Sequence, residues 1–361
     1  MSAPFAKGTR VGQSKLTVCV PTFNRARLLQ ALLEGFRAQL DGRDATIVVS
    51  DNASTDETIS TLSMLAAAGL RLRWVQSGEN LGPDRNFLRA VEFADAEFCW
   101  LFGSDDLPVP GSVDKVLAEL DRTGADVLLM GRYWCSYEME PIRRDAFFKP
   151  DVPKVFDTAT EIGLALYLEQ ATSICSLFSY LSSIVVRKGL WDAAGSVEPF
   201  VGSAYSHSAK LLAIVAAGAR IAYVPGPLVY CRGDNDHFLE HGAFNRCRID
   251  FVGFGRLIDT YLPREPFHGL ARRVLRKEYT LPRLLLVVSI ASGAECRELR
   301  GFLRDFDYPA WTRTVVALAG WRPVHAVWRR LAPALRRLWW MRQRRRFSAA
   351  DGSAAPAADQ S

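Results

Sequence analysis

The sequence predicts an α/β fold, a mostly parallel sheet with crossover helices, followed by a C-terminal helical extension. Up to Met130, short apolar segments alternate with apolar residues at helical spacing, which is the rhythm of strand, helix, strand units. From Phe251 onward the spacing is helical alone. With 361 residues and a hydrophobic content of 49%, the chain is long enough for one large domain with appendages or for two domains.

Each expected strand ends at a breaker or a polar loop. The first strand is stopped by Pro21, and the helix after it ends at Asp41 and Gly42. Ser54 or Thr55 can cap the helix that follows the second strand. The strands are expected at 16–20, 45–49, 72–76, 97–102, 126–130 and 221–224, and the helices between them near 27–40, 59–65, 87–91, 113–120 and 211–217.

Composition changes along the chain divide it into five expected segments. These are a flexible N-terminus (1–14), a sheet domain (15–245), a helical module (246–310), basic amphipathic helices (311–347) and a disordered tail (348–361). The seven cysteines are scattered without CxxC spacing, as expected of reduced, buried thiols in a cytosolic protein. The first fifteen residues lack an apolar region, so we expect neither a signal peptide nor an N-terminal anchor.

The chain is organised around the segment 97–110, EFCWLFGSDDLPVP. A buried strand there runs into a turn, so Asp105 and Asp106 lie at the carboxyl edge of the sheet, where open α/β sheets bind ligands. Two adjacent carboxylates need a cation or hydrogen-bond donors, and Mg²⁺ is held by one or two carboxylates together with substrate phosphates. On spacing alone, a solvated turn broken by Pro108 and Pro110 explains the segment equally well.

Other polar loops follow strands and gather at the same edge. Asp51 can accept a hydrogen bond from a base N–H or cap a helix. Asn80 and Asn86 can bind a ribose or diphosphate, or satisfy a turn. For Arg85 we favour a phosphate contact, because a cation beside two acids suits a phosphate.

Four motifs taken together resemble the family 2 glycosyltransferases of GT-A fold. They are VPTFNR (20–25), SDNASTDET (50–58), NLGPDRN (80–86) and FGSDDLPVPGSV (102–113), in the family's order over about a hundred residues. The pattern is most similar to abequosyltransferase-like bacterial surface-polysaccharide enzymes. One departure is Gly103, where the family usually carries the first Asp of its DxDD motif, which puts a cation or ribose contact in question.

The resemblance implies a nucleotide-sugar at this edge. It assigns the nucleotide-sugar to Pro21, Thr22, Asn24, Arg25, Asp51, Asn52, Asn80, Gly82, Arg85, Ser104 and Asp105. It assigns a divalent cation, Mg²⁺ or Mn²⁺, to Asp105 and Asp106, and gives Asp106 a catalytic part. After the strand near 228–232, Arg232 and His237 are expected to close over the diphosphate, with His237 also a metal candidate. A structural zinc site of His237 with Glu240 and His241 is disfavoured, because no cysteine frame accompanies it.

An inverting sugar transfer needs a base for the acceptor hydroxyl. Family members place an acidic pair just before a helix, and the corresponding segment here, 203–207, contains no carboxylate. We expect His207 to be this base, since an ordinary histidine pKa suits proton abstraction near neutrality. A capping or surface histidine is the competing interpretation, and Glu198 is the other candidate base.

The segment 311–347 has the pattern of helices that lie on a membrane surface. Residues 311–361 contain ten arginines against two aspartates, and five of the nine tryptophans. At helical spacing one face carries Val324, Val327, Trp328, Leu331, Leu335, Leu338 and Trp339, and the opposite face carries Arg322, Arg329, Arg330, Arg336 and Arg337. An apolar face packed on the core is the alternative. Nucleic acid is not an expected partner, because no nucleic-acid-binding fold accompanies the basic residues.

We therefore expect an inverting glycosyltransferase that moves a sugar from a nucleotide-diphosphate donor to a membrane-held, polyprenyl-linked glycan acceptor. It would be cytoplasmic and peripheral on the inner face of the cytoplasmic membrane. Two alternatives stay open: a nucleotidyltransferase of similar fold, and an inactive nucleotide-sugar-binding scaffold at the membrane. The sequence carries no signal for the donor base, the sugar, the linkage or the oligomeric state.

Overall fold

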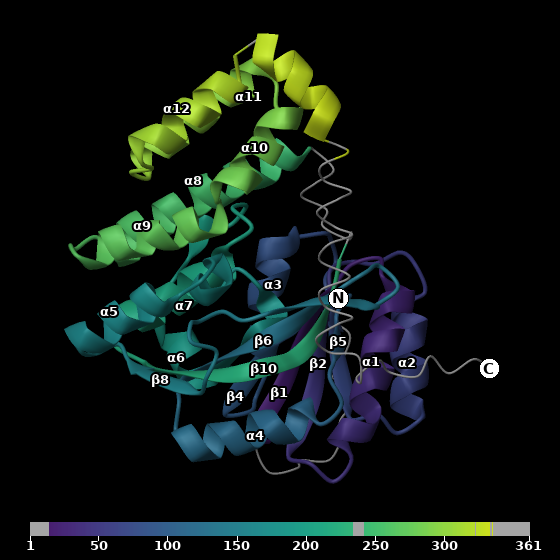
Figure 1. The fold of residues 1–361 in the computed structure, drawn as a ribbon. Coiled ribbons are helices and arrows are strands. Elements are labelled where there is room, and N and C mark those ends of the chain that lie inside the picture. The colour runs from purple at the N-terminus through teal and green to yellow at the C-terminus, as the bar shows by residue number, and fades with distance from the viewer. Residues whose placement is uncertain (1–13, 234–241, 322, 333, 335–361) are drawn as a thin grey trace.

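A single sheet forms the centre of the molecule (Figure 1). The computed structural model describes residues 14–233, 242–321, 323–332 and 334. The strands are β1 Leu16–Thr22, β2 Ala45–Asp51, β3 Leu72–Gln76, β4 Phe98–Leu101, β5 Leu107–Pro108, β6 Val127–Cys135, β7 Pro141–Asp145, β8 Lys154–Asp157, β9 Ile184–Arg187 and β10 Arg220–Arg232. The helices are α1 Ala26–Leu40, α2 Thr58–Ala67, α3 Pro83–Glu92, α4 Ser112–Thr123, α5 Glu161–Gln170, α6 Lys188–Ala193, α7 Ser206–Ala216, α8 Ala243–Tyr261, α9 Phe267–Glu278, α10 Leu281–Ile290, α11 Gly293–Asp305 and α12 Ala310–Ala319.

The sheet combines a parallel core with antiparallel additions. Its main path runs β3-β2-β1-β4-β9-β6-β10-β5, and β1 pairs in parallel with both β2 and β4. β9 runs antiparallel between β4 and β6, and the short strands β5, β7 and β8 also pair antiparallel. The predicted α/β fold with its C-terminal helices is confirmed. β9 was not predicted, because four residues are too few to show a strand period.

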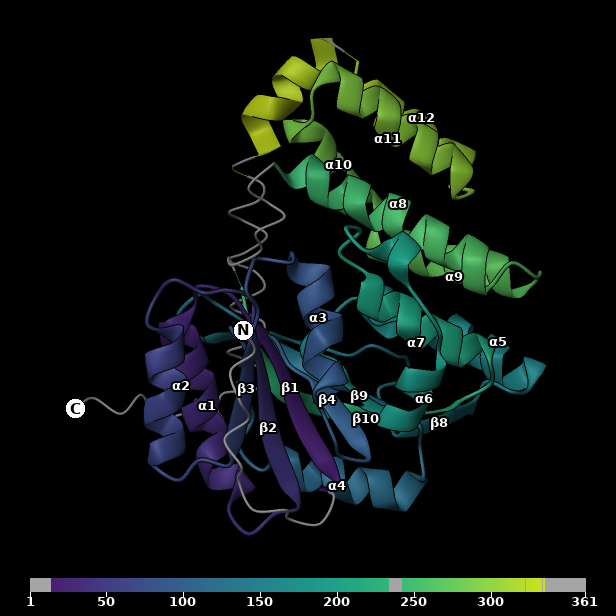
Figure 2. The ribbon, with the colours of Figure 1, turned by 180° about the vertical axis from the view of Figure 1, so that it is seen from behind.

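Helices cover both faces of the sheet (Figure 2). The buried residues of α1, α2 and α4 pack on one face, and those of α3, α5 and α7 on the other. Trp100 of β4 is fully buried, and its ring meets the rings of Phe36 and Phe102 edge-on. Its indole Nε1 donates to the carbonyl of Ser182 at 2.8 Å. This core therefore fixes the end of β4, from which the DD pair extends.

The helical extension, α8 to α12, shares its core with the α7 side of the sheet (Figure 1). The ring of Tyr205, just before α7, lies 4.5 Å from that of Phe254 in α8. The buried carboxylate of Asp250 accepts hydrogen bonds from the hydroxyls of Tyr205 and Tyr279. The expected boundary between residues 245 and 246 falls in the first turn of α8, so the extension continues this core.

One local expectation, the cap of the helix after β2, is corrected by the structure. Neither Ser54 nor Thr55 caps α2, because that helix begins at Thr58. The carboxylate of Asp56 instead accepts the backbone N–H of Thr58 at 3.1 Å.

The C-terminal end of the described chain is helical over 323–332. Trp328, expected on an exposed apolar face, is half-buried and donates its indole N–H to the carbonyl of Leu285 at 2.7 Å. His325 contacts the carbonyl of Val288 at 2.8 Å, so this segment is fixed to α10. Leu335, Leu338 and Trp339 lie outside the described residues. Among the described helices, none is both long and apolar enough to cross a bilayer.

Candidate active site

The ends of β1 and β2 carry two buried oxygens that lack hydrogen-bond partners within the described residues. Thr22 and Asp51 lie opposite each other in the parallel register of these strands. Both side chains are buried, and Thr22 Oγ1 and Asp51 Oδ1 have no partner in the described part of the chain. An unsatisfied buried acceptor costs about 1–3 kcal/mol, so such atoms are unusual unless a ligand completes them.

Hydrogen bonds join the loop that follows β1 to the loop that follows β2, beside these oxygens. The backbone N–H of Asn24 donates to Ser54 Oγ, and that of Thr55 donates to Asn24 Oδ1, each at 2.8 Å. Asn24 and Ala53 both have a positive φ, which Asn tolerates better than most residues. The neighbouring Pro21, also assigned to the nucleotide, is buried in β1 opposite Ser50.

The amide of Asn52, just after β2, forms hydrogen bonds with Asn80 and its neighbours in the loop that follows β3. The amide nitrogen of Asn52 donates to Asn80 Oδ1 at 2.7 Å and to the carbonyl of Gly82 at 3.3 Å. Asn52 Oδ1 accepts the N–H of Leu81 at 2.9 Å. The structure therefore supports the turn interpretation of Asn80. Asn86 is likewise satisfied, since its amide accepts from Ser50 Oγ and donates to the carbonyl of Thr22.

Asp105 and Asp106 are joined to two arginines from distant parts of the chain. Arg25 Nη1 lies 2.9 Å from Asp105 Oδ2. The side chain of Arg232, at the end of β10, donates to the carbonyl oxygen of Asp105 at 2.9 Å, and its backbone N–H donates to Asp106 Oδ1 at 3.0 Å. Ser104 is buried between these elements. The predicted convergence of the first loop, the DD pair and Arg232 is therefore present in the structure.

Asp106 is bound by two hydroxyls that sequence reasoning missed. Tyr180 donates to Asp106 Oδ2 at 2.7 Å, and Ser182 donates to the same atom at 2.5 Å. Burial, together with the charge of Asp105, raises the pKa of Asp106 to about 7. No signal in the sequence singled out these two donors, because Ser176 and Ser179 lie in the same segment and are equally polar.

Gly103 leaves room that this carboxylate pair occupies. A Cβ at this position would lie 3.0 Å from Asp105 Oδ1 and 3.3 Å from Asp106 Oδ2. The backbone N–H of Gly103 donates to Ser182 Oγ at 2.8 Å, so the turn is tied to the Asp106 site. Glycine in place of the first Asp of DxDD therefore lets the two carboxylates pack closely against residue 103.

The side chains of the DD pair fit a divalent cation that takes most of its ligands from a bound diphosphate and water. Within the residues that the structure describes, no group of three or more His, Cys, Asp or Glu side chains is arranged to hold a metal. Both oxygens of Asp106 already accept protein donors. Asp105 is the more accessible carboxylate, and one carboxylate plus diphosphate oxygens and water suffices for Mg²⁺. His237, the third metal candidate, lies outside the described residues.

Arg85 and Glu198 form an exposed ion pair between α3 and the segment before α7. Arg85 Nη1 lies 3.1 Å from Glu198 Oε2. The adjacent Asp84 is buried and accepts the backbone N–H groups of Gly202 and Ala204 at 2.7 and 2.9 Å. The start of α3 therefore positions the turn that leads into α7.

His207 lies in the interior, next to Ser206, whose backbone N–H donates to Asp84. Its ring is 2% exposed, meets Phe87 edge-on and has Nε2 3.0 Å from the carbonyl of Phe178. Burial lowers the pKa of His207 to about 4. Its role as the base stays a prediction, but these surroundings are those of a structural histidine and oppose it.

Comparison with known proteins decides the family. The model for "Glycosyl transferase family 2" matches residues 17–183, from β1 to Ser183 just before β9. Abequosyltransferase RfbV of Salmonella typhimurium is 34% identical over 295 residues, which is 80% of this chain and 88% of that protein. The chain belongs to glycosyltransferase family 2. This glycosyltransferase is also 31% identical to the GalNAc(5)-diNAcBac-PP-undecaprenol beta-1,3-glucosyltransferase of Campylobacter jejuni, over 31% of this chain and 37% of that one.

Solved structures confirm the GT-A fold of this glycosyltransferase. Residues 1–349 of S. aureus TarS in complex with UDP match with a TM-score of 0.59 and 17% identity, covering 90% of this chain and 91% of that one. The same protein in complex with UDP-GlcNAc matches with a TM-score of 0.59 and 16% identity, covering 90% and 92%. The transferase class and family expected from the four motifs are thus confirmed.

Proposed function

We propose that this glycosyltransferase takes a sugar, with inversion, from a nucleotide-diphosphate donor held at the carboxyl ends of β1, β2 and β4, and passes it to a lipid-linked glycan. The unpaired buried oxygens of Thr22 and Asp51 carry the proposal. A base N–H would satisfy Asp51 Oδ1. Because both atoms are buried, a base reaches them only when an adjoining loop moves, and the hydrogen bonds through Asn24 are the ones that open.

The diphosphate would lie by Arg25 and Arg232. Both guanidinium groups already contact the DD pair, so a diphosphate that displaces Arg25 from Asp105 finds a cation and a carboxylate side by side. A Mg²⁺ or Mn²⁺ ion bound by Asp105 and the diphosphate would offset charge on the departing nucleotide. Asp106, held by Tyr180 and Ser182, would fix the position of Asp105.

Of the two candidate bases, the contacts favour Glu198 over His207. Glu198 is exposed and lies against Arg85 in the first turn of α3, the helix that follows the carboxyl end of β3. Its carboxylate is therefore open to an acceptor hydroxyl. His207 has no such opening, since its ring is buried against Phe87.

The acceptor is proposed from the relatives and from the basic C-terminal region. One relative is named for a glycan carried on PP-undecaprenol, and the other is an abequosyltransferase. An acceptor of this kind is confined to a membrane. We place the enzyme in the cytoplasm, on the inner face of the cytoplasmic membrane, with residues 311–347 toward the lipid.

A donor and acceptor screen tests the proposal. The full chain is incubated with UDP-, CDP-, GDP- and dTDP-sugars, with and without Mn²⁺, and with polyprenyl-diphosphate-linked glycans. Transfer of the sugar to the lipid-linked glycan is expected for one donor class. In a parallel incubation with nucleoside triphosphates and sugar phosphates, release of pyrophosphate would instead show a nucleotidyltransferase. Donor binding without turnover on any acceptor would show a scaffold.

A further inference from the structure

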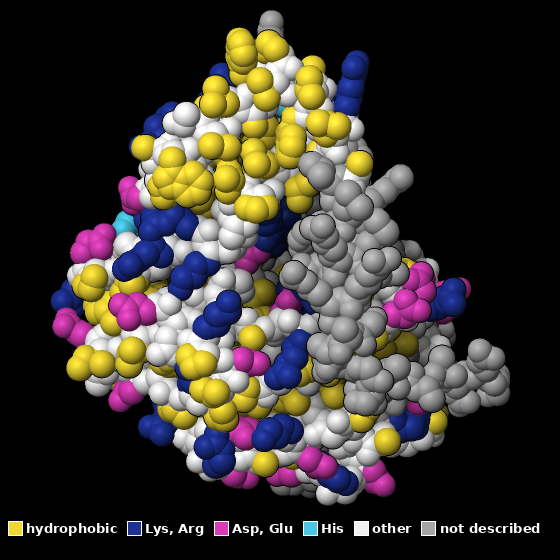
Figure 3. Space-filling view, in the orientation of Figure 1, with side chains coloured by type: hydrophobic (Ala, Val, Ile, Leu, Met, Phe, Trp, Pro, Cys, Tyr) yellow, Lys and Arg dark blue, Asp and Glu magenta, His cyan; other side chains and the backbone are white. Residues whose placement is uncertain are grey.

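The helical extension exposes a continuous apolar surface at the end far from the sheet (Figure 3). It comes from α10, α12, the helical segment 323–332 and Trp321, which lies between the last two. Its members are each at least half exposed: Ile290, Trp311, Leu318, Trp321, Val327 and Leu331. Two exposed tryptophans beside aliphatic side chains are a composition that a soluble surface rarely carries without a partner. We call this set the C-terminal apolar surface.

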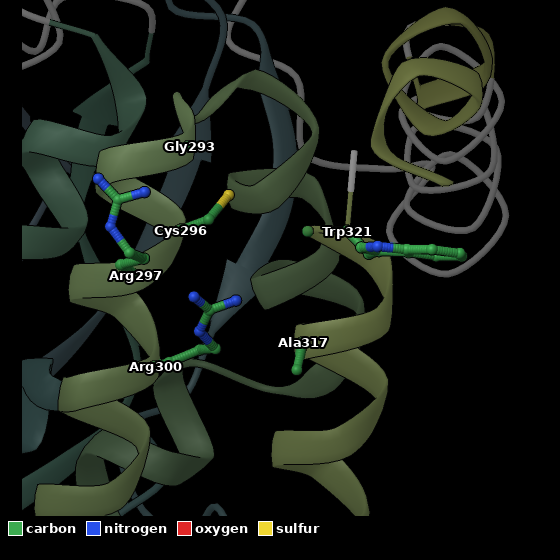
Figure 4. A pocket seen from close by; sticks show the side chains of 7 residues that line it. Gly293, Cys296, Arg297, Arg300, Ala317 and Trp321 are labelled. Atoms are coloured by element: carbon green, nitrogen blue, oxygen red, sulfur yellow. The ribbon is translucent and has the colours of Figure 1, made fainter. Parts of the chain in front are cut away.

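A basic hollow opens at the edge of this surface. Arg297 and Arg300 of α11 line it together with Trp321, and its volume is about 320 Å³ (Figure 4). The Arg300 side chain points into the space between α11 and the end of α12 (Figure 4). Within the described residues, neither Arg297 nor Arg300 has an ion pair or a hydrogen bond to a side chain. Two arginines without counter-charges, one turn apart on α11 and lining one hollow, offer positive charge to an anion, and arginine suits phosphate especially.

The positive charge of the C-terminal region determines which partner can cover the C-terminal apolar surface and the hollow beside it. From residue 308 to residue 350 the sequence contains no Asp or Glu and ten Arg. A second copy of the chain would bring its own arginines against these, since a twofold contact joins the same surface to itself. The chain's own residues 335–350 carry six of those arginines, so they are equally unsuited to cover the hollow.

We infer that the C-terminal apolar surface lies in a bilayer interface and that Arg297 and Arg300 bind the phosphate of an anionic phospholipid headgroup. The tryptophans suit the boundary between headgroups and acyl chains, where an apolar ring body and a polar N–H are both accommodated. The inference rests on the membrane-held acceptor proposed above, and it adds a specific headgroup site outside the segment 311–347.

Vesicle co-sedimentation of the full chain tests this site. The vesicles contain phosphatidylcholine alone or mixed with phosphatidylglycerol, and the variant is Arg297→Gln with Arg300→Gln. Binding to the anionic vesicles is expected to weaken roughly 30-fold, the effect of two arginines at an anionic surface. The control, Arg37→Gln with Arg43→Gln, removes the same charge from two surface ion pairs on the sheet domain and should change binding little. An equal loss in both variants would overturn the headgroup site.

A second variant examines the apolar contact. Trp311→Ser with Trp321→Ser should weaken binding to both vesicle types and leave the chain monomeric. If it leaves vesicle binding unchanged and only dissociates a dimer, a second copy covers the surface and the inference is wrong.

Sugar transfer to a soluble acceptor analogue is measured on the same proteins. Transfer without vesicle binding refutes this inference alone, whereas vesicle binding without transfer to any acceptor refutes the proposed function.

Discussion

Arg25 Nη1 lies 2.9 Å from Asp105 Oδ2, so the first carboxylate of the DD pair is paired with a cation delivered by the loop after β1. A diphosphate and its metal ion must compete with this contact. Arg25→Gln should therefore weaken donor binding about 10-fold or more, because a charge-assisted phosphate contact is lost. Calorimetry with the preferred donor measures it. An unchanged affinity would mean that Arg25 serves only to hold Asp105.

Gly103→Asp should make the site depend on metal. The new Cβ would lie 3.0 Å from Asp105 Oδ1, and a third carboxylate would add repulsion. In chelator, the free energy of unfolding should fall about 1–3 kcal/mol below that of the control Gly103→Ala, and Mn²⁺ should restore it. Thermal unfolding with and without Mn²⁺ gives the comparison. Equal stabilisation by Mn²⁺ of both variants would contradict this interpretation of Gly103.

Asp106 should make stability fall as the pH rises. Burial beside Asp105 raises its pKa to about 7, whereas the unfolded chain has the ordinary carboxyl value. The folded protein therefore retains a proton between about pH 4 and about pH 7 that the unfolded chain releases. The associated stability is complete below about pH 4 and lost as the pH rises through about 7, with a size of up to about 4 kcal/mol.

Urea unfolding at several pH values measures this effect. Asp106→Asn cannot ionise, so its stability should change less over the same range, which isolates the contribution of this group. A variant as pH-dependent as the parent would show that another group is responsible.

Glu198 and His207 should respond differently to substitution. Glu198→Gln should lower turnover about 10²-fold with little change in stability, since an exposed ion pair contributes little. His207→Ala should cost about 2–3 kcal/mol of stability, because it removes a buried ring from contact with Phe87. Turnover and unfolding are measured on both. A folded His207→Ala that has lost turnover, beside an active Glu198→Gln, would restore His207 as the base.

The sequence predicted the parallel strands and the carboxyl edge well, because β1, β2 and β4 are almost wholly buried and end in polar loops. Asp51 and Asp105 could be located from that rule alone. Tyr180 and Ser182 could not, since they reach Asp106 from more than seventy residues away, beside an antiparallel strand too short to show a period. The burial of His207 could not be predicted for a similar reason: polarity in a sequence does not show that the ring is enclosed by Phe87 and Tyr205.

The tail illustrates the same limit. Helical spacing placed Trp328 on one face with Val327 and Leu331, and the structure exposes the latter two. Trp328 instead binds the carbonyl of Leu285, because an indole N–H can satisfy a helix carbonyl that an aliphatic side chain cannot. Residue spacing predicts which side chains share a face of the helical segment 323–332. The contact with α10 determines which of these side chains are buried.

The account depends most on Asp51 as the acceptor for the donor base. Calorimetry with the four nucleotide-sugar classes measures the part of Asp51 in donor binding directly. It compares the parent with Asp51→Asn and with the control Asp44→Asn, whose residue lies at the opposite end of β2. We predict that one class binds the parent and the control equally and binds Asp51→Asn about 10-fold or more weakly. Equal binding to all three proteins, or no binding of any donor to the parent, would contradict a nucleotide-sugar site at this edge.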